Sequence, residues 1–251
     1  EGNPDDHYIR PAAAANWTVA SAQRNLSIVG AGNASGIASQ GGKYQVYLRG
    51  HADVTTGAVL TIAAHGVTIE NLAFHRGGVT SNGLLRLYGD GTDANNAHNS
   101  SINNCMFRWW NQNTPDCAVT IVDSWYTGIY NSIFYNCKDG IAIKGVQSTI
   151  KDVTIQGCKF FGLAADISAD IRLWGSNSDF LVIRNCDFAH MTPSGGTNKF
   201  ISAQGGMTSN GGTIMGCRFS DNITAGTEIS TITNMKIVDC FDSAGAINTG
   251  S

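Results

Sequence analysis

The sequence predicts an all-β fold in which short strands wind into a parallel β-solenoid of about seven to eight coils. Three observations predict it: a hydrophobic unit that recurs along the chain, an alternating motif that precedes each unit, and a turn-forming composition. Of the 251 residues, 30 are Gly and only 14% are charged. Because Gly, Asn, Ser and Thr favour turns over helix interiors, this composition argues against a helical bundle.

The recurring unit begins with Ile and ends with Phe five positions later. It returns every 23 to 33 residues, which is the period of a repeat architecture. An earlier copy without Phe begins at Ile28. The copies are Ile69–Phe74, Ile102–Phe107, Ile129–Phe134, Ile155–Phe160, Ile183–Phe188, Ile214–Phe219 and the degenerate Ile237–Asp242.

The spacing inside the unit predicts a sharp bend. Side chains of a strand alternate between its two faces, so Cys105 and Phe107 share a face whereas Ile102 and Cys105, three apart, do not. Both Ile102 and Cys105 reach the interior only if the chain turns at Asn104. The seven copies carry Asn, Gly or Asp there, which are the residues that tolerate a left-handed backbone. Each unit is therefore expected to be strand, one-residue corner, strand.

A second series of alternating strands precedes the units, and most of its members end in Gly. We expect these segments to form the first sheet of the solenoid. They are 46–50, 60–64, 85–89, 119–123, 141–145, 171–175 and 201–205.

The expected organisation is an N-terminal cap or arm over 1–25, the solenoid over 26–242 and a C-terminal tail over 243–251. A solenoid exposes strand edges at its ends and needs caps. The segment Pro11–Gln23 is expected to supply a short capping helix.

Five of the seven cysteines fall in one inward slot of the repeat, at positions 105, 158, 186, 217 and 240. The favoured interpretation is a stack of small buried side chains, as free Cys often forms. The alternative is disulfides between successive coils, although in-register parallel side chains give a poor torsion for that bond. Cys117 and Cys137 lie outside the stack and leave a further bridge open.

The repeat, the Asn corner and the coil length resemble the right-handed parallel β-helix family of pectin-lyase-like proteins over residues 26 to 242. The opening stretches 25–32 and 58–74 are similar to phage structural proteins of that fold. The resemblance implies a family that includes polysaccharide lyases, glycoside hydrolases, tail spikes, adhesins and non-enzymatic virion proteins. Fold alone does not decide among these functions.

In the enzymes of that family, substrate lies across the outer face of the first sheet. Here that face is expected to carry basic and aromatic side chains and no carboxylate, whereas a glycoside hydrolase needs two carboxyl groups. Asp123 is assigned to a turn instead. The candidate binding residues are Arg49, Arg86, Tyr88, Lys144, Arg172 and Trp174 on this face, and Trp109, Trp110, Trp125 and Tyr126 in flanking loops, where they either pack on the flank or form a contact patch.

No catalytic residue, metal site or cofactor is assigned, because no ligand spacing or catalytic constellation is present. A net charge of −3 disfavours nucleic acid as a partner, and no segment is apolar for long enough to suggest a membrane. The expected function is a non-enzymatic virion component, a capsid decoration or a tail or fibre protein, that binds viral structural proteins and forms homo-oligomers. The alternatives are a polysaccharide lyase or depolymerase that uses Arg or Lys as base, and a secreted glycan-binding adhesin.

Overall fold

The fold is described from a computed structural model. It covers residues 7–9, 15–30, 46–49, 57–75, 83–90, 96–108, 117–137, 139–146, 150–162, 169–175, 177–190, 200–204, 208–220, 229, 232, 234–242 and 245–247. Within these ranges all regular structure is β-strand, and no helix there could span a membrane.

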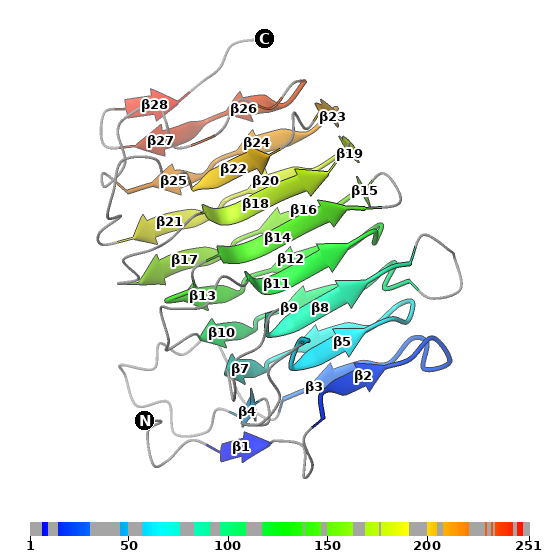
Figure 1. The fold of residues 1–251 in the computed structure, drawn as a ribbon. Helices are drawn as coiled ribbons and strands as arrows, with labels where there is room; N and C mark the ends of the chain where they lie inside the picture. Colours follow the sequence, from blue (N-terminus) through cyan, green and yellow to red (C-terminus); the bar gives the residue numbers. More distant parts are fainter. Residues whose placement is uncertain are drawn as a thin grey trace.

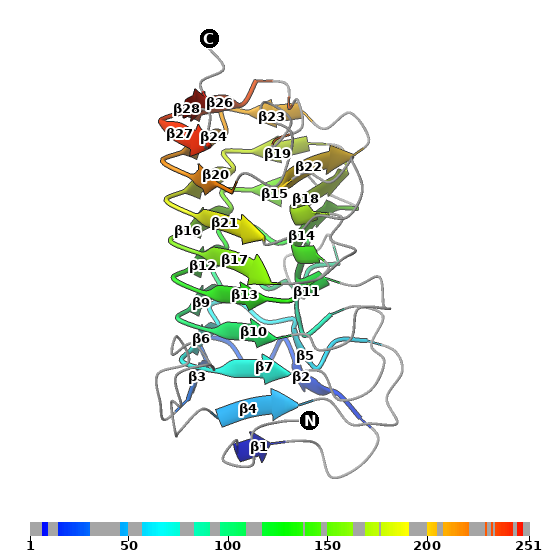
Figure 2. The ribbon, with the colours of Figure 1, turned by 90° about the vertical axis from the view of Figure 1, so that its left-hand side faces the viewer.

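Three long sheets, here named A, B and C, run along the molecule (Figures 1 and 2). Sheet B holds β2 (Trp17–Val19), β5 (Leu60–Ile62), β8 (Leu85–Tyr88), β11 (Cys117–Val122), β14 (Asp139–Gly145), β18 (Ala169–Gly175) and β22 (Ile201–Gln204). Sheet C holds β3 (Ser27–Val29), β6 (Thr68–Glu70), β9 (Ser101–Asn103), β12 (Gly128–Tyr130), β16 (Thr154–Gln156), β20 (Val182–Arg184), β24 (Thr213–Met215) and β26 (Lys236–Val238).

Sheet A completes each coil, and a small sheet D widens the later ones. Sheet A holds β1 (His7–Ile9), β4 (Val46–Arg49), β7 (Ala73–His75), β10 (Met106–Arg108), β13 (Ile133–Tyr135), β17 (Lys159–Gly162), β21 (Asp187–His190), β25 (Arg218–Phe219), β27 (Cys240–Asp242) and β28 (Gly245–Ile247). Sheet D holds β15 (Ile150–Lys151), β19 (Asn177–Asp179) and β23 (Thr208–Asn210).

The chain passes from sheet B to sheet C to sheet A and then begins the next coil on sheet B. Every strand pair is parallel except β27 with β28. Such crossovers between parallel strands are right-handed. The molecule is thus a right-handed parallel β-helix, as the repeat predicts.

The bend between sheets C and A lies where the sequence places it. Asn71, Asn104, Asn131, Gly157, Asn185, Gly216 and Asp239 all have φ between 49° and 65°. The left-handed residue turns the chain, so that Ile102 and Cys105 on either side of Asn104 both reach the interior and are fully buried. The predicted one-residue corner is confirmed in all seven copies.

The interior is a set of columns of identical side chains. The Phe74, Phe107, Phe134, Phe160 and Phe188 rings stack with centroids 4.7–5.0 Å apart and interplanar angles of 4–11°. Phe219 continues the column on Phe188 at 4.9 Å. This separation matches the spacing of adjacent strands in a sheet, so each ring contributes offset stacking in addition to its buried area.

The cysteine slot is a column of free, buried thiols, which confirms the stack and excludes disulfides in this structure. The Cys158 Sγ–H donates to the Ile129 carbonyl oxygen at 3.6 Å, and Cys105, Cys186, Cys217 and Cys240 each donate to the equivalent Ile of an earlier coil. Ser132 occupies the slot in one coil, where its hydroxyl donates to Tyr130 O at 2.9 Å. Cys117 and Cys137 are also free and buried.

A second column of left-handed residues, not predicted from the sequence, forms the corner before sheet C. We call it the entry corner; Asn25, Gly66, Asn99, Tyr126, Asp152, Phe180 and Gly211 belong to it, with φ of 50–87°. The members from Asn25 to Phe180 are held in register by backbone N–H groups that donate to the following coil. Asn99 N–H, for example, donates to Trp125 O and Tyr126 N–H donates to Lys151 O, at 3.0 and 2.9 Å.

Two local predictions are wrong. The segment Val46–Arg49 is β4 of sheet A, paired with β7, instead of the first strand of sheet B. Sheet B starts with β2, at Trp17–Val19, where a capping helix was expected. Residues 15–23 contain this strand and turns, and residues 11–14 lie outside the described residues. A β2 strand forms because Trp17, Thr18 and Val19 pair in register with Leu60, Thr61 and Ile62.

Candidate functional site

The outer face of sheet B gathers five of the predicted binding residues: Arg86, Tyr88, Lys144, Arg172 and Trp174. In the register of the sheet, Lys144 on β14 lies directly beside Trp174 on β18, and Arg172 lies beside Ala142. Arg86 and Tyr88 project from β8, two strands away across β11. Side chains two apart on one strand share a face, so Arg172 and Trp174 project from the same side of β18. The register places Lys144 of β14 on that side as well.

Cations lie over the aromatic rings of this face. The Lys144 Nζ is 4.3 Å from the Trp174 ring centroid, and the Arg172 Cζ is 4.9 Å from it. The Arg86 Cζ is 4.2 Å from the Tyr88 centroid. These distances are within the range of favourable cation–π contact, so the contacts orient both rings. We call Lys144, Arg172 and Trp174 the basic–aromatic cluster.

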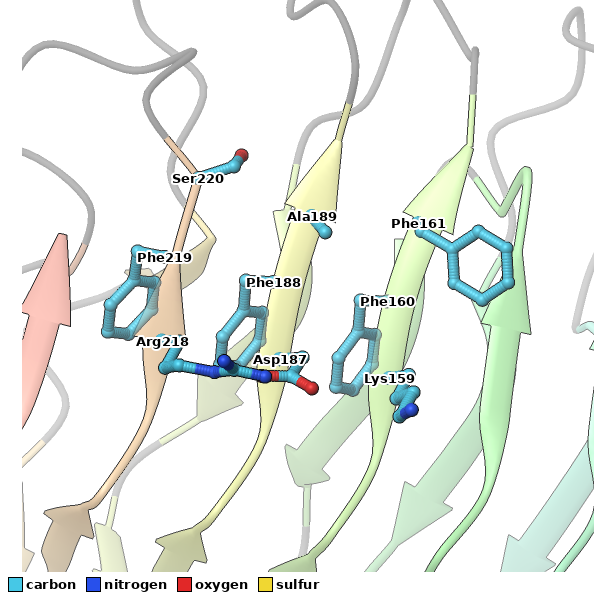
Figure 3. A pocket seen from close by; sticks show the side chains of 9 residues that line it. All are labelled: Lys159, Phe160, Phe161, Asp187, Phe188, Ala189, Arg218, Phe219 and Ser220. Carbon is cyan, nitrogen blue, oxygen red and sulfur yellow. The ribbon is translucent and has the colours of Figure 1, made fainter. Parts of the chain in front are cut away.

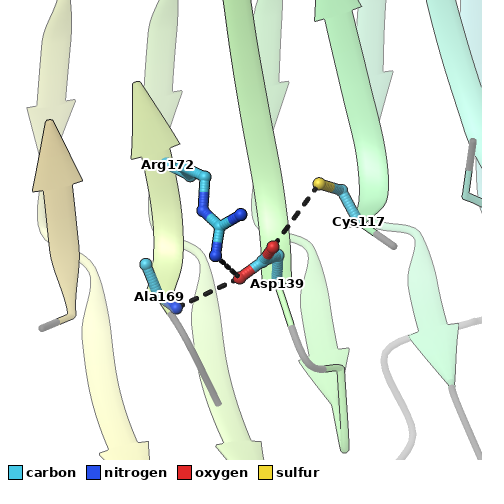
Figure 4. A network of polar contacts seen from close by, with 4 residues as sticks. All are labelled: Cys117, Asp139, Ala169 and Arg172. Atoms are coloured by element: carbon cyan, nitrogen blue, oxygen red, sulfur yellow. Dashed lines mark hydrogen bonds and ion pairs between the residues drawn. The ribbon is translucent and has the colours of Figure 1, made fainter. Parts of the chain in front are cut away.

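A buried carboxylate anchors the cluster (Figure 4). Asp139, at the start of β14, accepts from the Arg172 Nη2 at 3.1 Å and from the Ala169 backbone N–H at 3.1 Å, both on Oδ1. Its Oδ2 accepts from the Cys117 Sγ at 3.9 Å. The side chain of Asp139 is 1% exposed and that of Arg172 is 12% exposed. A buried charge requires such partners, so this ion pair fixes Arg172 beside the Trp174 ring.

The residues expected on the outer face carry no carboxylate, and the carboxylate that anchors the cluster, Asp139, is a buried residue that the sequence did not single out. The alternating strand was expected to begin at Ile141, and Asp139 lies two residues before it, on a β14 that starts earlier. Asp123, by contrast, has the turn role assigned to it: its φ is 44°, and its Oδ1 accepts the Val146 backbone N–H at 2.8 Å.

The other predicted binding residues do not join the cluster. Arg49 is on sheet A, beside His75 in the register. Trp125 packs on the flank: its ring is stacked on His98 at 4.5 Å, and its backbone N–H donates to His98 Nδ1 at 2.8 Å. Tyr126 is 54% exposed on the entry corner. Trp109 and Trp110 lie outside the described residues.

A pocket of about 330 Å³ lies against sheet A, over β17, β21 and β25 (Figure 3). Its polar lining is the Arg218–Asp187 ion pair, with Nε 2.7 Å from Oδ1, and Lys159. The hydrogen bond that the Arg218 guanidinium donates to Asp187 raises the pKa of Arg218. Because Arg218 is 74% exposed, solvent weakens this pair and the site lacks the buried polar groups of a specific pocket.

No family model and no curated protein matches the sequence. Several solved structures resemble it, and three examples follow. The catalytic domain of a GH87 alpha-1,3-glucanase is 14% identical, with a TM-score of 0.42 over 94% of this chain and 54% of that one. Tailspike protein 2 from Escherichia coli O157:H7 bacteriophage CAB120 is 12% identical, with a TM-score of 0.42 over 95% of this chain and 33% of that one. Pectin methylesterase from Yersinia enterocolitica is 10% identical, with a TM-score of 0.32 over 100% of this chain and 89% of that one.

This chain thus spans about half of the glucanase domain and a third of the tailspike. None of these similarities bears on the activity of this chain. Among the described residues, no group of three or more His, Cys, Asp and Glu side chains is arranged to hold a metal ion. The arrangement on sheet B offers a basic and aromatic surface, which is suited to binding an acidic or polar partner.

Proposed function

We propose that the chain is a structural component of a phage virion, in a capsid decoration or a tail or fibre, and that it acts as a stiff rod. The basic–aromatic cluster is the surface through which it binds neighbouring viral subunits or further copies of itself. The similarity of residues 25–32 and 58–74 to phage structural proteins, noted from the sequence, supports the virion assignment.

The unbroken columns of the interior support the mechanical role. The Phe column passes without a gap from Phe74 to Phe219, and the left-handed corner repeats in every coil from Asn71 to Asp239. Close-packed interiors have low compressibility and transmit strain. A load applied along the rod is therefore shared by all the coils.

The main support for the proposed contact surface is the position of Trp174 on a lateral face, where Lys144 and Arg172 both contact its ring. Trp and Arg dominate binding energy at protein interfaces when they are pre-positioned. The Asp139–Arg172 pair and the Lys144 contact already fix Trp174, so little side-chain freedom is lost when a partner covers it.

Analysis of purified phage particles by mass spectrometry and electron microscopy tests this function. The proposal predicts that the chain is present at a fixed ratio to the other structural proteins and in an ordered position. Photocross-linking from p-benzoylphenylalanine at position 174 is expected to capture another virion subunit, whereas the same probe at Phe241, which is 48% exposed on sheet A, captures far less. Absence of the chain from the particles would overturn the proposal.

A second candidate function is binding of an acidic surface polysaccharide, and the same cluster favours it, because sugars stack on Trp and their acidic groups pair with Lys and Arg. A titration with an acidic polysaccharide tests it: Trp174→Ala should weaken binding at least tenfold, and Phe241→Ala should not. Appearance of unsaturated sugars, followed by ultraviolet absorbance, would identify a lyase instead.

A further inference from the structure

The entry corner carries three side chains in successive coils that the fold does not explain: Tyr126, Asp152 and Phe180. Their φ values are 54°, 50° and 55°. Tyr126 N–H donates to Lys151 O and Asp152 N–H donates to Asp179 O, both at 2.9 Å, so each residue lies one coil above the previous one.

Tyr and Phe are unfavourable choices for these positions. A bulky residue with a left-handed backbone is a conformational outlier, and such strain concentrates at functional sites. The other members of the column are Asn25, Gly66, Asn99 and Gly211, which accept this backbone readily. Core packing does not explain the aromatic rings either, since Tyr126 is 54% and Phe180 is 56% exposed.

Asp152 lies between the two rings along the column. It is partly buried, and its carboxylate has no hydrogen-bond or ion-pair partner among the described residues. The neighbouring cation, Lys151, is directed elsewhere, with its Nζ 4.9 Å from the Trp125 ring centroid. The column therefore presents an available negative charge flanked by two exposed rings.

The spacing fits a cation above Asp152. Adjacent coils are about 4.8 Å apart, so Tyr126 and Phe180 are attached about 9.6 Å apart with Asp152 midway. A cation bound at the carboxylate is thereby offered an exposed aromatic ring on the coil before and on the coil after, the pairing that cation–π recognition uses. The Phe180 ring rests against Gly211 of the following coil, where an added Cβ would be 3.2 Å from it.

We propose that Tyr126, Asp152 and Phe180 form a binding site for an organic cation, the guanidinium or ammonium group of an Arg or Lys side chain on a partner protein. This site is separate from the basic–aromatic cluster, and it goes beyond the proposed function. The carboxylates of Asp152 and Asp179 repel an anionic ligand. Two rings separated by a carboxylate also make too small an apolar patch for a hydrophobic partner.

Three substitutions to Asn separate binding from folding, because Asn already occupies this column at Asn25 and Asn99. The probe is N-acetyl-arginine methylamide, and the neutral control ligand is the corresponding citrulline compound. Nuclear magnetic resonance titration of the full chain measures binding, and thermal unfolding measures stability. Val146→Asn is the matched control, because Val146 is an exposed apolar residue (70%) outside the column.

The arginine probe is expected to bind saturably and to shift the resonances of the three residues, and the citrulline compound to bind at least tenfold more weakly. Asp152→Asn, Tyr126→Asn and Phe180→Asn should each weaken arginine binding roughly tenfold without lowering Tm. Val146→Asn should leave the affinity unchanged. Equal binding of the two ligands, no saturable binding, or wild-type affinity in all three column variants would overturn the proposal.

Discussion

Asn104 donates a side-chain hydrogen bond of 2.6 Å to the Oδ1 of Asn71 on the preceding coil, and both residues have a left-handed backbone. The contact joins two corners of the rod through side chains as well as through the sheets. It explains why Asn is frequent at a position where Gly alone would satisfy the backbone. Gly157 and Gly216, in the same column, show that the side chain is not required for the turn.

Replacement of Asn104 separates these two contributions. Asn104→Gly removes the side-chain hydrogen bond while keeping a residue that adopts the left-handed backbone without strain, and it should lower the free energy of unfolding by about 1 kcal/mol. Asn104→Ala removes the same hydrogen bond and also places in the left-handed region a residue whose side chain cannot hydrogen-bond locally. This strain should lower the free energy of unfolding by about 1 kcal/mol more. Urea denaturation measures both. Equal stability of the two variants would contradict the role of the left-handed corner.

The Phe column should be the most sensitive part of the core. Phe134 is 1% exposed and stacks between Phe107 and Phe160, so Phe134→Ala should lower the free energy of unfolding by about 3–5 kcal/mol. Phe241→Ala, at a 48% exposed site on sheet A, is expected to cost much less. Chemical denaturation compares them, and a similar loss for both would show that the column does not carry the packing energy.

The Asp139–Arg172 ion pair should be non-additive. Asp139→Asn leaves the guanidinium of Arg172 buried without its counter-charge, and we expect a loss of about 3 kcal/mol. The double variant Asp139→Asn with Arg172→Met removes both charges and should recover part of that loss. A double-mutant cycle measured by urea unfolding gives the coupling. Strict additivity would mean that the pair is not formed.

The thiol column predicts a loss of stability at alkaline pH. Burial raises the pKa of the Cys105 thiol to about 12, whereas an unfolded thiol titrates near pH 8.5. Since the folded state holds this proton more tightly, the stabilisation is complete below about pH 8.5 and is lost as pH rises to about 12.

Cys105→Ser tests this prediction, because Ser132 shows that the slot accepts a hydroxyl. The wild-type chain should lose on the order of 2 kcal/mol more than the variant between pH 7 and pH 10.5, measured by urea unfolding at each pH. Thiol-reactive reagent should also modify the native chain very slowly. Rapid reaction of the seven thiols in the folded protein would contradict their burial.

The interior of the coils could be predicted because the spacing of buried residues within the recurring unit is the same from coil to coil. The three-residue step from Ile102 to Cys105 and the two-residue step from Cys105 to Phe107 require a corner at Asn104, and every copy obeys them. The misplacement of Val46–Arg49 has a physical cause. Its alternation is the same as that of the sheet B strands, and only the pairing with β7 distinguishes them.

The candidate site was predicted in part. Lys144, Arg172 and Trp174 follow from alternation along β14 and β18, but Asp139 precedes the alternating segment and was missed. The entry corner was missed because Tyr126 and Phe180 are not turn-forming residues. A residue spacing of 26 to 28 between Tyr126, Asp152 and Phe180, which matches the coil period, is the signal that could have found them.

Photocross-linking from position 174 in intact phage particles tests the central claim most directly. The account predicts that the probe at Trp174 captures a capsid or tail subunit or a second copy of the chain, and that Lys144→Glu reduces the yield by removing one of the two cations that hold the site. A chain that is absent from particles, or that releases unsaturated products from an acidic polysaccharide, would contradict the account.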